Sequence, residues 1–237
     1  LLETAQTGAL VEARLEMNLY LLFVQKTMAL PPWLGEKIVP IVYEQIDESS
    51  LPNLLAEKRA DFEASELSAD FLKVNRAYFS EIGVDSSHAT LEYVVPTGYS
   101  ANTLITLPIC TVAGQVYVGL EQRSLPVPQL HEGNSLLLTV PAIRLPKEVK
   151  NNFDLTAFKA SMKFGRSKVL YSAKLGEKYF PSIGISPEQV YPFVVCLDVP
   201  DESLRWVALA ALEQQLPKLR DAHLLICIHR LRHALKN

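Results

Sequence analysis

Lys159 and Lys163 are four positions apart, a spacing that would let both side chains bind the same anion. Residues 153–164 are a plausible helix that begins near Asn152 or Asp154. Side chains at positions i and i+4 lie on the same helix face. Two ammonium groups on that face can bind diphosphate oxygens through charge-assisted hydrogen bonds. The alternative is a pair of surface lysines with no ligand.

The charge distribution places these lysines in the most basic part of the chain. The net charge is only −3, but residues 143–176 carry 8 basic and 2 acidic side chains, whereas residues 1–88 carry 7 basic and 14 acidic ones. Such local asymmetry creates a positive potential that the net charge conceals. It favours an anionic small molecule as ligand; we expect neither a nucleic acid partner nor a membrane.

Other catalytic patterns are absent from the sequence. There is no G-x-S-x-G elbow, P-loop or G-x-G-x-x-G motif, so nucleophilic catalysis has no support. The histidines at 223, 229 and 233 lie on one expected helix, but no cysteine or carboxylate at ligand spacing completes a zinc site. We expect exposed or capping histidines there, and no bound metal.

Three segments in order resemble conserved elements of one enzyme family. Residues 115–123 (QVYVGLEQR) look like a strand that ends in a Q-x-R or E-x-R element. Residues 138–145 (LTVPAIRL) resemble an E-L-P-A-G-R entry, and residues 179–188 (YFPSIGISPE) are similar to a P-S-P-G-x-x-x-E loop. Together, over residues 101–234, they resemble the ADP-ribose-pyrophosphatase branch of the Nudix hydrolases.

The resemblance lacks the metal-binding carboxylates of that family. The Nudix box is G-x5-E-x7-R-E-U-x-E-E-x-G-U, where U is aliphatic, and its glutamates hold Mg²⁺ or Mn²⁺ against a diphosphate. Aligned on Gly165, the three helix glutamates fall on Lys159, Met162 and Lys163, and the first glutamate falls on Lys150. Shifting the register by one residue restores none of the three helix glutamates. The resemblance therefore implies a degenerate box, no cofactor and no metal.

The resemblance also implies which residues meet the ligand. In the family the strand arginine and the box lie near the phosphates, and the loop glutamate lies near the substrate. The expected ligand-binding residues are Arg123, Arg144, Lys159, Lys163 and Glu188. Glu188 has an alternative interpretation as a charge that stabilises a helix N-terminus after Ser186 and Pro187.

The elements that must position these residues change in character near residue 88. Helical spacing of apolar residues predicts helices in residues 1–88, including one or two from residue 51 to residue 79. Residues 89–237 should form an α/β domain, a Nudix-like α/β/α sandwich around a mixed sheet. Its expected strands span residues 90–95, 103–110, 115–120, 135–140 and 191–197, with a tight turn at 113–114, a short helix at 204–212 and a final helix at 221–235.

Composition indicates an ordinary globular protein, since 49% of residues are hydrophobic and 21% are charged. The three cysteines, Cys110, Cys196 and Cys227, are widely spaced in apolar runs, which is typical of buried free thiols in a reducing compartment. No apolar run approaches the length of a membrane span and no signal-peptide pattern occurs. We expect a cytoplasmic protein.

Three functions are consistent with these observations. The first is a non-hydrolytic binding module for a nucleoside-diphosphate-type ligand or a protein partner. The second is an active Nudix-type pyrophosphohydrolase that uses non-standard carboxylates, namely Glu121, Glu132, Glu177 and Glu188. The third is a structural interaction domain, with the N-terminal helices docking on the sheet, building a homodimer or holding a protein partner.

Overall fold

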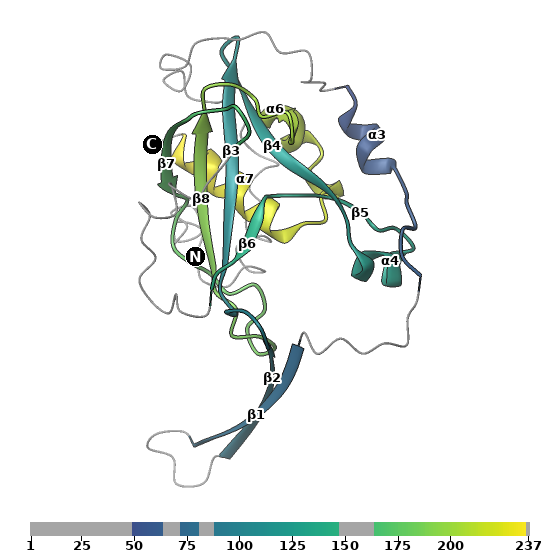
Figure 1. The fold of residues 1–237 in the computed structure, drawn as a ribbon, viewed down its shortest axis with the longest axis vertical. Coiled ribbons are helices and arrows are strands. Elements are labelled where there is room, and N and C mark those ends of the chain that lie inside the picture. The colour runs from purple at the N-terminus through teal and green to yellow at the C-terminus, as the bar shows by residue number, and fades with distance from the viewer. Residues whose placement is uncertain (1–48, 64–71, 81–87, 147–163, 236–237) are drawn as a thin grey trace.

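A computed structural model of the protein describes residues 49–63, 72–80, 88–146 and 164–235 (Figure 1). Lys159, Lys163 and most of the helix expected at residues 153–164 lie outside these ranges. The strands are β1 (Leu72–Ser80), β2 (His88–Pro96), β3 (Thr103–Val112), β4 (Gln115–Ser124), β5 (Leu136–Thr139), β6 (Ala142–Arg144), β7 (Val169–Lys174), β8 (Val190–Leu197) and β9 (Arg205–Ala208). The helices are α3 (Leu51–Ala56), α4 (Pro126–Glu132), α6 (Leu209–Gln214), the 3₁₀ helix η2 (Leu216–Lys218) and α7 (Ala222–Ala234).

The described strands from β3 onward form one mixed sheet. Its order is β5-β4-β3-β8-β7, with β6 also paired to β3 and β9 to β4. β3 and β8 run parallel, whereas β4 and β6 are antiparallel to β3. All ten residues of β3 are buried, as its nearly continuous apolar sequence predicts for a strand covered on both faces. The expected α/β class with a mixed sheet is confirmed.

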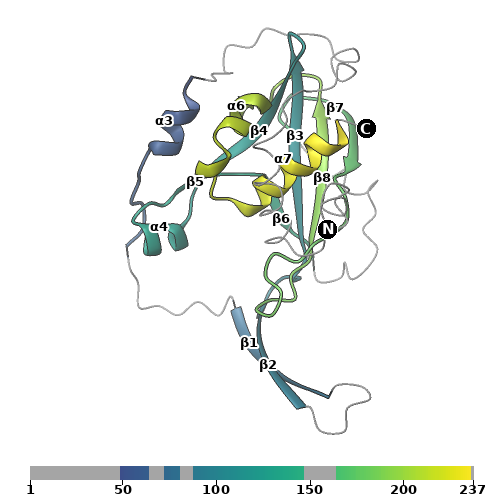
Figure 2. The same cartoon turned by 180° about the vertical axis from the view of Figure 1, so that it is seen from behind.

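Helices α6 and α7 lie together on one face of the sheet, as the view from behind shows (Figure 2). The side chains of Leu224, Leu225 and Ile228 on α7 belong to the main core with the apolar residues of β3, β4 and β8. Asp221 caps α7, because its carboxylate accepts the backbone N–H of His223 at 3.0 Å. The predicted final helix is thus confirmed, including its start.

A buried ion pair joins these two helices. Arg232 Nη1 on α7 lies 3.2 Å from Glu213 Oε1 on α6, and the two side chains are only 6% and 4% exposed. Taking both charges out of water costs free energy that only their mutual attraction and hydrogen bonds offset. The pair links α6 to α7 inside the protein.

The segment at residues 72–80 is a strand, so the helix expected to extend to residue 79 is wrong there. Only α3 is helical in the described part of residues 51–79. β1 pairs with β2 along its whole length, from Leu72 opposite Pro96 to Ser80 opposite His88. A partner strand supplies main-chain hydrogen bonds that a local helical pattern does not anticipate. The hairpin extends from one end of the body and crosses the boundary expected at residue 88 (Figure 1).

The prediction of a short helix at residues 204–212 is wrong for its first half. Residues 205–208 form β9, and α6 begins after them. β9 pairs with β4, which places Trp206 opposite Gly119. A Cβ atom on Gly119 would lie 2.9 Å from Leu204 Cδ1 and 3.0 Å from the Trp206 ring. Glycine leaves room for this close packing, and a larger residue would force the Leu204 or Trp206 side chain to shift.

Residues 49–63 pack against the body of the molecule. Leu51 on α3 is fully buried in the main core. Beyond α3, the carbonyl oxygen of Arg59 accepts the backbone N–H of Ser135 at 2.7 Å. The Asp61 carboxylate accepts the hydroxyl of Ser135 at 2.8 Å. This part of the N-terminal region therefore covers β4, β5 and the loop between them.

Candidate functional site

The candidate site lies where β3 begins, because two distant parts of the chain pair with its first residue. In β6, Arg144 is opposite Thr103. On the other side of β3, Val190 at the start of β8 is opposite the same Thr103. Glu188 lies two residues before Val190, so the strand pairing carries it to the same end of the sheet as Arg144. Sequence reasoning selected both residues, and the structure brings them together.

The ion pair between them is loose and partly exposed. Arg144 Nη1 lies 4.0 Å from Glu188 Oε1, and the side chains are 34% and 19% exposed. The Thr103 hydroxyl donates a hydrogen bond of 2.5 Å to the same carboxylate oxygen. Thr103 therefore orients the Glu188 carboxylate. A guanidinium carries five N–H donors and can contact a carboxylate and an anionic ligand together.

The loop before Glu188 is fixed by its own hydrogen bonds and by β2. The Ser186 hydroxyl accepts the backbone N–H of Glu188 at 3.2 Å. The carbonyl of Ser182 accepts from the backbone N–H groups of Ile185 and Ser186, and the carbonyl of Ile185 accepts from Val94 on β2 at 2.8 Å. The loop thus ties the β1–β2 hairpin to the sheet.

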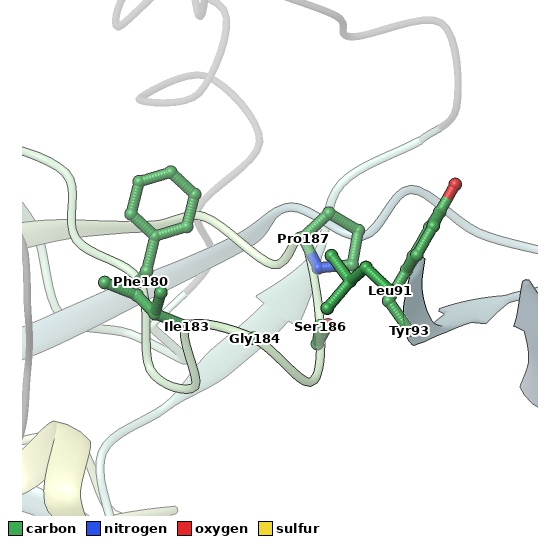
Figure 3. Close-up of a pocket in the computed structure, with 7 residues that line it drawn as sticks. All are labelled: Leu91, Tyr93, Phe180, Ile183, Gly184, Ser186 and Pro187. Atoms are coloured by element: carbon green, nitrogen blue, oxygen red, sulfur yellow. The ribbon is translucent and has the colours of Figure 1, made fainter. Parts of the chain in front are cut away.

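An apolar pocket of about 380 Å³ opens between β2 and this loop (Figure 3). Its lining consists almost entirely of carbon atoms, and it comes from Leu91, Tyr93, Phe180, Ile183, Gly184, Ser186 and Pro187. Pro187, which lines the pocket, is the sequence neighbour of Glu188, but neither Glu188 nor Arg144 is among the lining residues. A concave apolar site with a few convergent polar groups is the usual form of a small-molecule site.

Sequence reasoning missed the apolar half of the site. Residues 179–188 were selected for their proline, serine and glutamate. No role was predicted for the aliphatic residues between them. The signal was present as Ile183 and Ile185, two large apolar residues in a loop that should be polar. The sequence predicted that Leu91 and Tyr93 lie on a strand. It did not predict that this strand lies beside the loop.

Arg123 is not part of this cluster. It lies near the end of β4 opposite Leu137 of β5, and its Nη1 is 3.9 Å from Glu121 Oε2 on the same strand. The guanidinium is about half exposed. The structure therefore separates Arg123 from the Arg144–Glu188 pair.

The residues that carry the alternative carboxylates lie at separate places. The Glu132 carboxylate on α4 pairs with Arg220, whereas Glu177 accepts a hydrogen bond from Arg230 on α7 through its backbone carbonyl. Within the described ranges, no three or more histidine, cysteine, aspartate or glutamate side chains gather closely enough to hold a metal ion.

Two of the three C-terminal histidines have a structural role. His223 Nδ1 lies 2.7 Å from the hydroxyl of the buried Tyr179, next to the loop that forms the pocket. His229 is buried, so the expectation that these histidines are exposed or capping is wrong for it. Its place on α7 explains the difference, because that helix is buried around most of its circumference.

All three cysteines are buried free thiols, which confirms that expectation. Burial raises the pKa of the Cys110 thiol to about 12 and that of Cys196 to about 11. Both thiols therefore stay protonated and unreactive near neutral pH. None of the helices in the described ranges is long and apolar enough to cross a membrane.

Comparisons with known proteins add little to this picture. No family model matches the chain, and no curated protein matches it. One similar solved structure is described as the crystal structure of an ADP compounds hydrolase. It has 15% sequence identity and a TM-score of 0.45, and the alignment covers 72% of this chain and 97% of that one.

Proposed function

We propose that this chain is a Nudix-like module that binds a nucleoside-diphosphate-type ligand, such as ADP-ribose, without metal-dependent hydrolysis. The observation that carries the proposal is the partly exposed Arg144–Glu188 pair, whose glutamate directly follows Pro187 of the apolar pocket. The guanidinium would contact phosphate oxygens, and the carboxylate would accept a hydrogen bond from a ligand hydroxyl group. Lys159 and Lys163 would complete the anion site on the degenerate box helix.

The sequence supports the non-hydrolytic half of this proposal. The positions that carry glutamates in the Nudix box are lysine or methionine here, and ammonium groups repel a divalent cation at short range. Direct pairing of lysine with phosphate would replace the metal bridge. Burial of the three free thiols supports a reducing, cytoplasmic location for the module.

Calorimetric titration with ADP-ribose tests this function. We expect binding in EDTA that is unchanged by Mg²⁺, because no metal mediates the contact. Glu188→Gln should weaken ADP-ribose binding, since a neutral amide is a weaker acceptor for a hydroxyl group. Glu202→Gln is a matched control, because Glu202 is exposed in the loop between β8 and β9. An absence of binding to any diphosphate would overturn the proposal.

A second candidate function, protein interaction, is favoured by the β1–β2 hairpin. Leu72 and Val74 lie on one face of β1 and are 55% and 65% exposed, although both are large and apolar. A two-stranded hairpin is marginally stable alone in water, so a partner on this face would stabilise it. Light scattering should report a homodimer or heavier complex that Val74→Asp dissociates; a monodisperse monomer would remove the homodimer form of this candidate.

A further inference from the structure

Strand β7 lies at one edge of the sheet, and its outer side has no partner strand in the part of the chain that the structure describes (Figure 1). The view from behind places it at the same outer edge (Figure 2). The opposite edge, at β5, is covered by residues 49–63, whose Arg59 carbonyl accepts the backbone N–H of Ser135. An edge strand presents backbone N–H and C=O groups that can pair with a strand from another chain.

Two large side chains on β7 are exposed beside these backbone groups. Leu170 is 51% exposed and Tyr171 is 45% exposed. Val169 lies opposite Leu197 and Tyr171 lies opposite Cys196, so a bulge leaves Leu170 without an opposing residue on β8. Side chains on neighbouring strands contact each other across the gap between the strands. Leu170 and Tyr171 therefore offer carbon contacts to an added strand.

The same edge is basic. Residues 164–178 carry four exposed cations, Arg166, Lys168, Lys174 and Lys178, and one carboxylate, Glu177. None of the ion pairs among the described residues involves one of these four cations. Asp198 lies beside Lys168, but its carboxylate accepts the backbone N–H groups of Lys168 and Val199. The edge therefore presents a positive potential to a partner.

A polar pocket of about 210 Å³ lies at the end of β7. It is lined by Lys174, Gly176, Glu177, Lys178, Tyr191, Pro192 and Phe193. The Lys178 ammonium donates a hydrogen bond of 2.7 Å to Gln189 Oε1 and lies 5.9 Å from the centre of the Tyr191 ring. An ammonium group has three donors, so Lys178 keeps two for a ligand. Two lysines outweigh the single carboxylate of the lining, and the pocket fits a carboxylate side chain.

The charge of the edge also decides which kind of strand fits it. A second copy of this chain, paired through β7, would bring the same four cations to the same edge. Like charges opposite each other on neighbouring strands destabilise pairing, and lysines on an edge oppose self-association. A strand that carries carboxylates would meet the opposite charge. Charge complementarity therefore favours an acidic partner over a second copy.

We infer that β7 accepts an acidic, extended segment of a partner protein as an added strand, with one carboxylate in the pocket lined by Lys174 and Lys178. The β7 backbone would supply hydrogen bonds, and the cations would select acidic sequences. Neither Arg144 nor Glu188 lines this pocket. The inference goes beyond the proposed function and does not depend on it.

A peptide titration on the full chain tests this inference. The probe is a fluorescein-labelled peptide of alternating glutamate and valine, about six residues long, which is the usual length of a strand. We expect this peptide to bind, and a peptide with lysine in place of each glutamate not to bind. Binding should slow the hydrogen exchange of backbone amides in residues 169–175, because an added strand forms hydrogen bonds with this edge.

A methylated peptide separates strand pairing from simple charge attraction. Methyl groups on every backbone nitrogen of the glutamate–valine peptide keep its charge but remove its hydrogen-bond donors. We expect this peptide to bind at least about tenfold more weakly, or roughly 1.4 kcal/mol.

Charge reversal then locates the binding site. Lys168→Glu with Lys174→Glu should weaken binding of the glutamate–valine peptide by at least about tenfold, because repulsion replaces attraction at two positions. Both lysines are exposed, which keeps the cost to folding small. Lys58→Glu with Lys218→Glu is the matched control. It changes the net charge equally, at exposed positions beside the opposite edge of the sheet.

A second variant tests the apolar contact without changing the charge. Leu170→Ser should weaken binding of the glutamate–valine peptide by about threefold, because the half-exposed side chain offers only part of its carbon surface. Leu130→Ser is the control, since Leu130 on α4 is also exposed and lies away from β7. Equal affinities of the two serine variants would remove Leu170 from the binding surface and count against the inference.

Each remaining outcome overturns the inference in a different way. Equal binding of the methylated peptide would indicate a basic patch without strand pairing. Equal losses in the two charge-reversal variants would indicate attraction by overall charge. Competition by pyrophosphate would place the lysines in a diphosphate site. A dimer that Leu170→Ser dissociates would make a second copy the occupant. No binding of the glutamate–valine peptide would overturn the inference whether or not the protein binds ADP-ribose.

Discussion

Arg144 Nη1 lies 4.0 Å from Glu188 Oε1, and the carboxylate is oriented by the Thr103 hydroxyl. The contact depends on β3, because β6 pairs with one edge of its first residue and β8 with the other. The strand topology therefore creates the site, and changes at either residue should act on binding more than on folding.

Arg144→Ala should weaken pyrophosphate and ADP-ribose binding by at least about tenfold. A hydrogen bond to a charged group contributes roughly 1.5–3 kcal/mol, and the lower end applies because this guanidinium is partly exposed. Calorimetry measures the change. Arg205→Ala is the control, since Arg205 on β9 is exposed and lies outside the pocket. Equal losses in both variants would mean that general charge, rather than this site, attracts the ligand.

The double variant Lys159→Ala, Lys163→Ala should also weaken pyrophosphate binding by about tenfold or more, or roughly 1.4 kcal/mol. Loss of two ammonium groups removes ion pairing that salt screens, so the salt dependence of the affinity should become flatter. Titrations at low and high ionic strength measure both effects. Unchanged affinity would move the anion site away from the box helix and leave Arg144 as its main cation.

Local sequence patterns were sufficient for the elements that carry their own signals. β3, β4 and β8 are dense in aliphatic residues, α7 has an apolar face with Asp221 as its cap, and the turn at Ala113 and Gly114 has positive φ at both residues, as a two-residue hairpin requires. The strand pattern and the terminal helix together predicted the α/β class.

The predictions failed for elements whose structure depends on a partner that is distant in the sequence. β1 is a strand because β2 pairs with it, and β9 precedes α6 because Trp206 packs over Gly119 of β4. The pocket arises when a hydrogen bond joins Val94 to Ile185. No local periodicity encodes these contacts. Arg144 and Glu188 could therefore be selected from the sequence, whereas the pocket between β2 and the loop could not be predicted.

Glu213→Gln should destabilise the fold by about 3–5 kcal/mol, because it removes the negative charge that lies beside the buried Arg232 guanidinium. Urea denaturation measures the loss. Arg76→Ala gives the comparison, since the Arg76–Glu92 pair on the hairpin is 60% and 54% exposed and should contribute less than about 1 kcal/mol. Similar small losses for both variants would show that the buried pair does not hold α6 against α7.

Stability should fall as the pH rises above 9. Burial raises the pKa of Cys110 from 9.0 to about 12 and that of Cys196 from 9.0 to about 11. Between these values the unfolded thiols lose protons that the folded thiols keep, so the unfolded state binds fewer protons and its relative free energy falls. The stability contribution is complete below pH 9 and is lost through about pH 11 to 12.

The urea midpoint at pH 8 and at pH 10.5 measures this loss. Burial also raises the pKa of Tyr171 from 10.0 to about 12, which adds a fall of the same sign above pH 10. Cys110→Ala should therefore show a smaller fall than the parent protein. A midpoint that does not change with pH would mean that the thiols ionise equally in both states.

Binding without turnover is the central claim, and one assay tests it most directly. The protein is incubated with ADP-ribose and either Mg²⁺ or Mn²⁺ at concentrations where calorimetry shows the ligand bound, and AMP release is followed. We predict bound ligand and no metal-dependent AMP release, because lysines and a methionine occupy the box positions of the metal-binding glutamates. Metal-dependent release that Glu188→Gln abolishes would contradict the account and identify an active hydrolase.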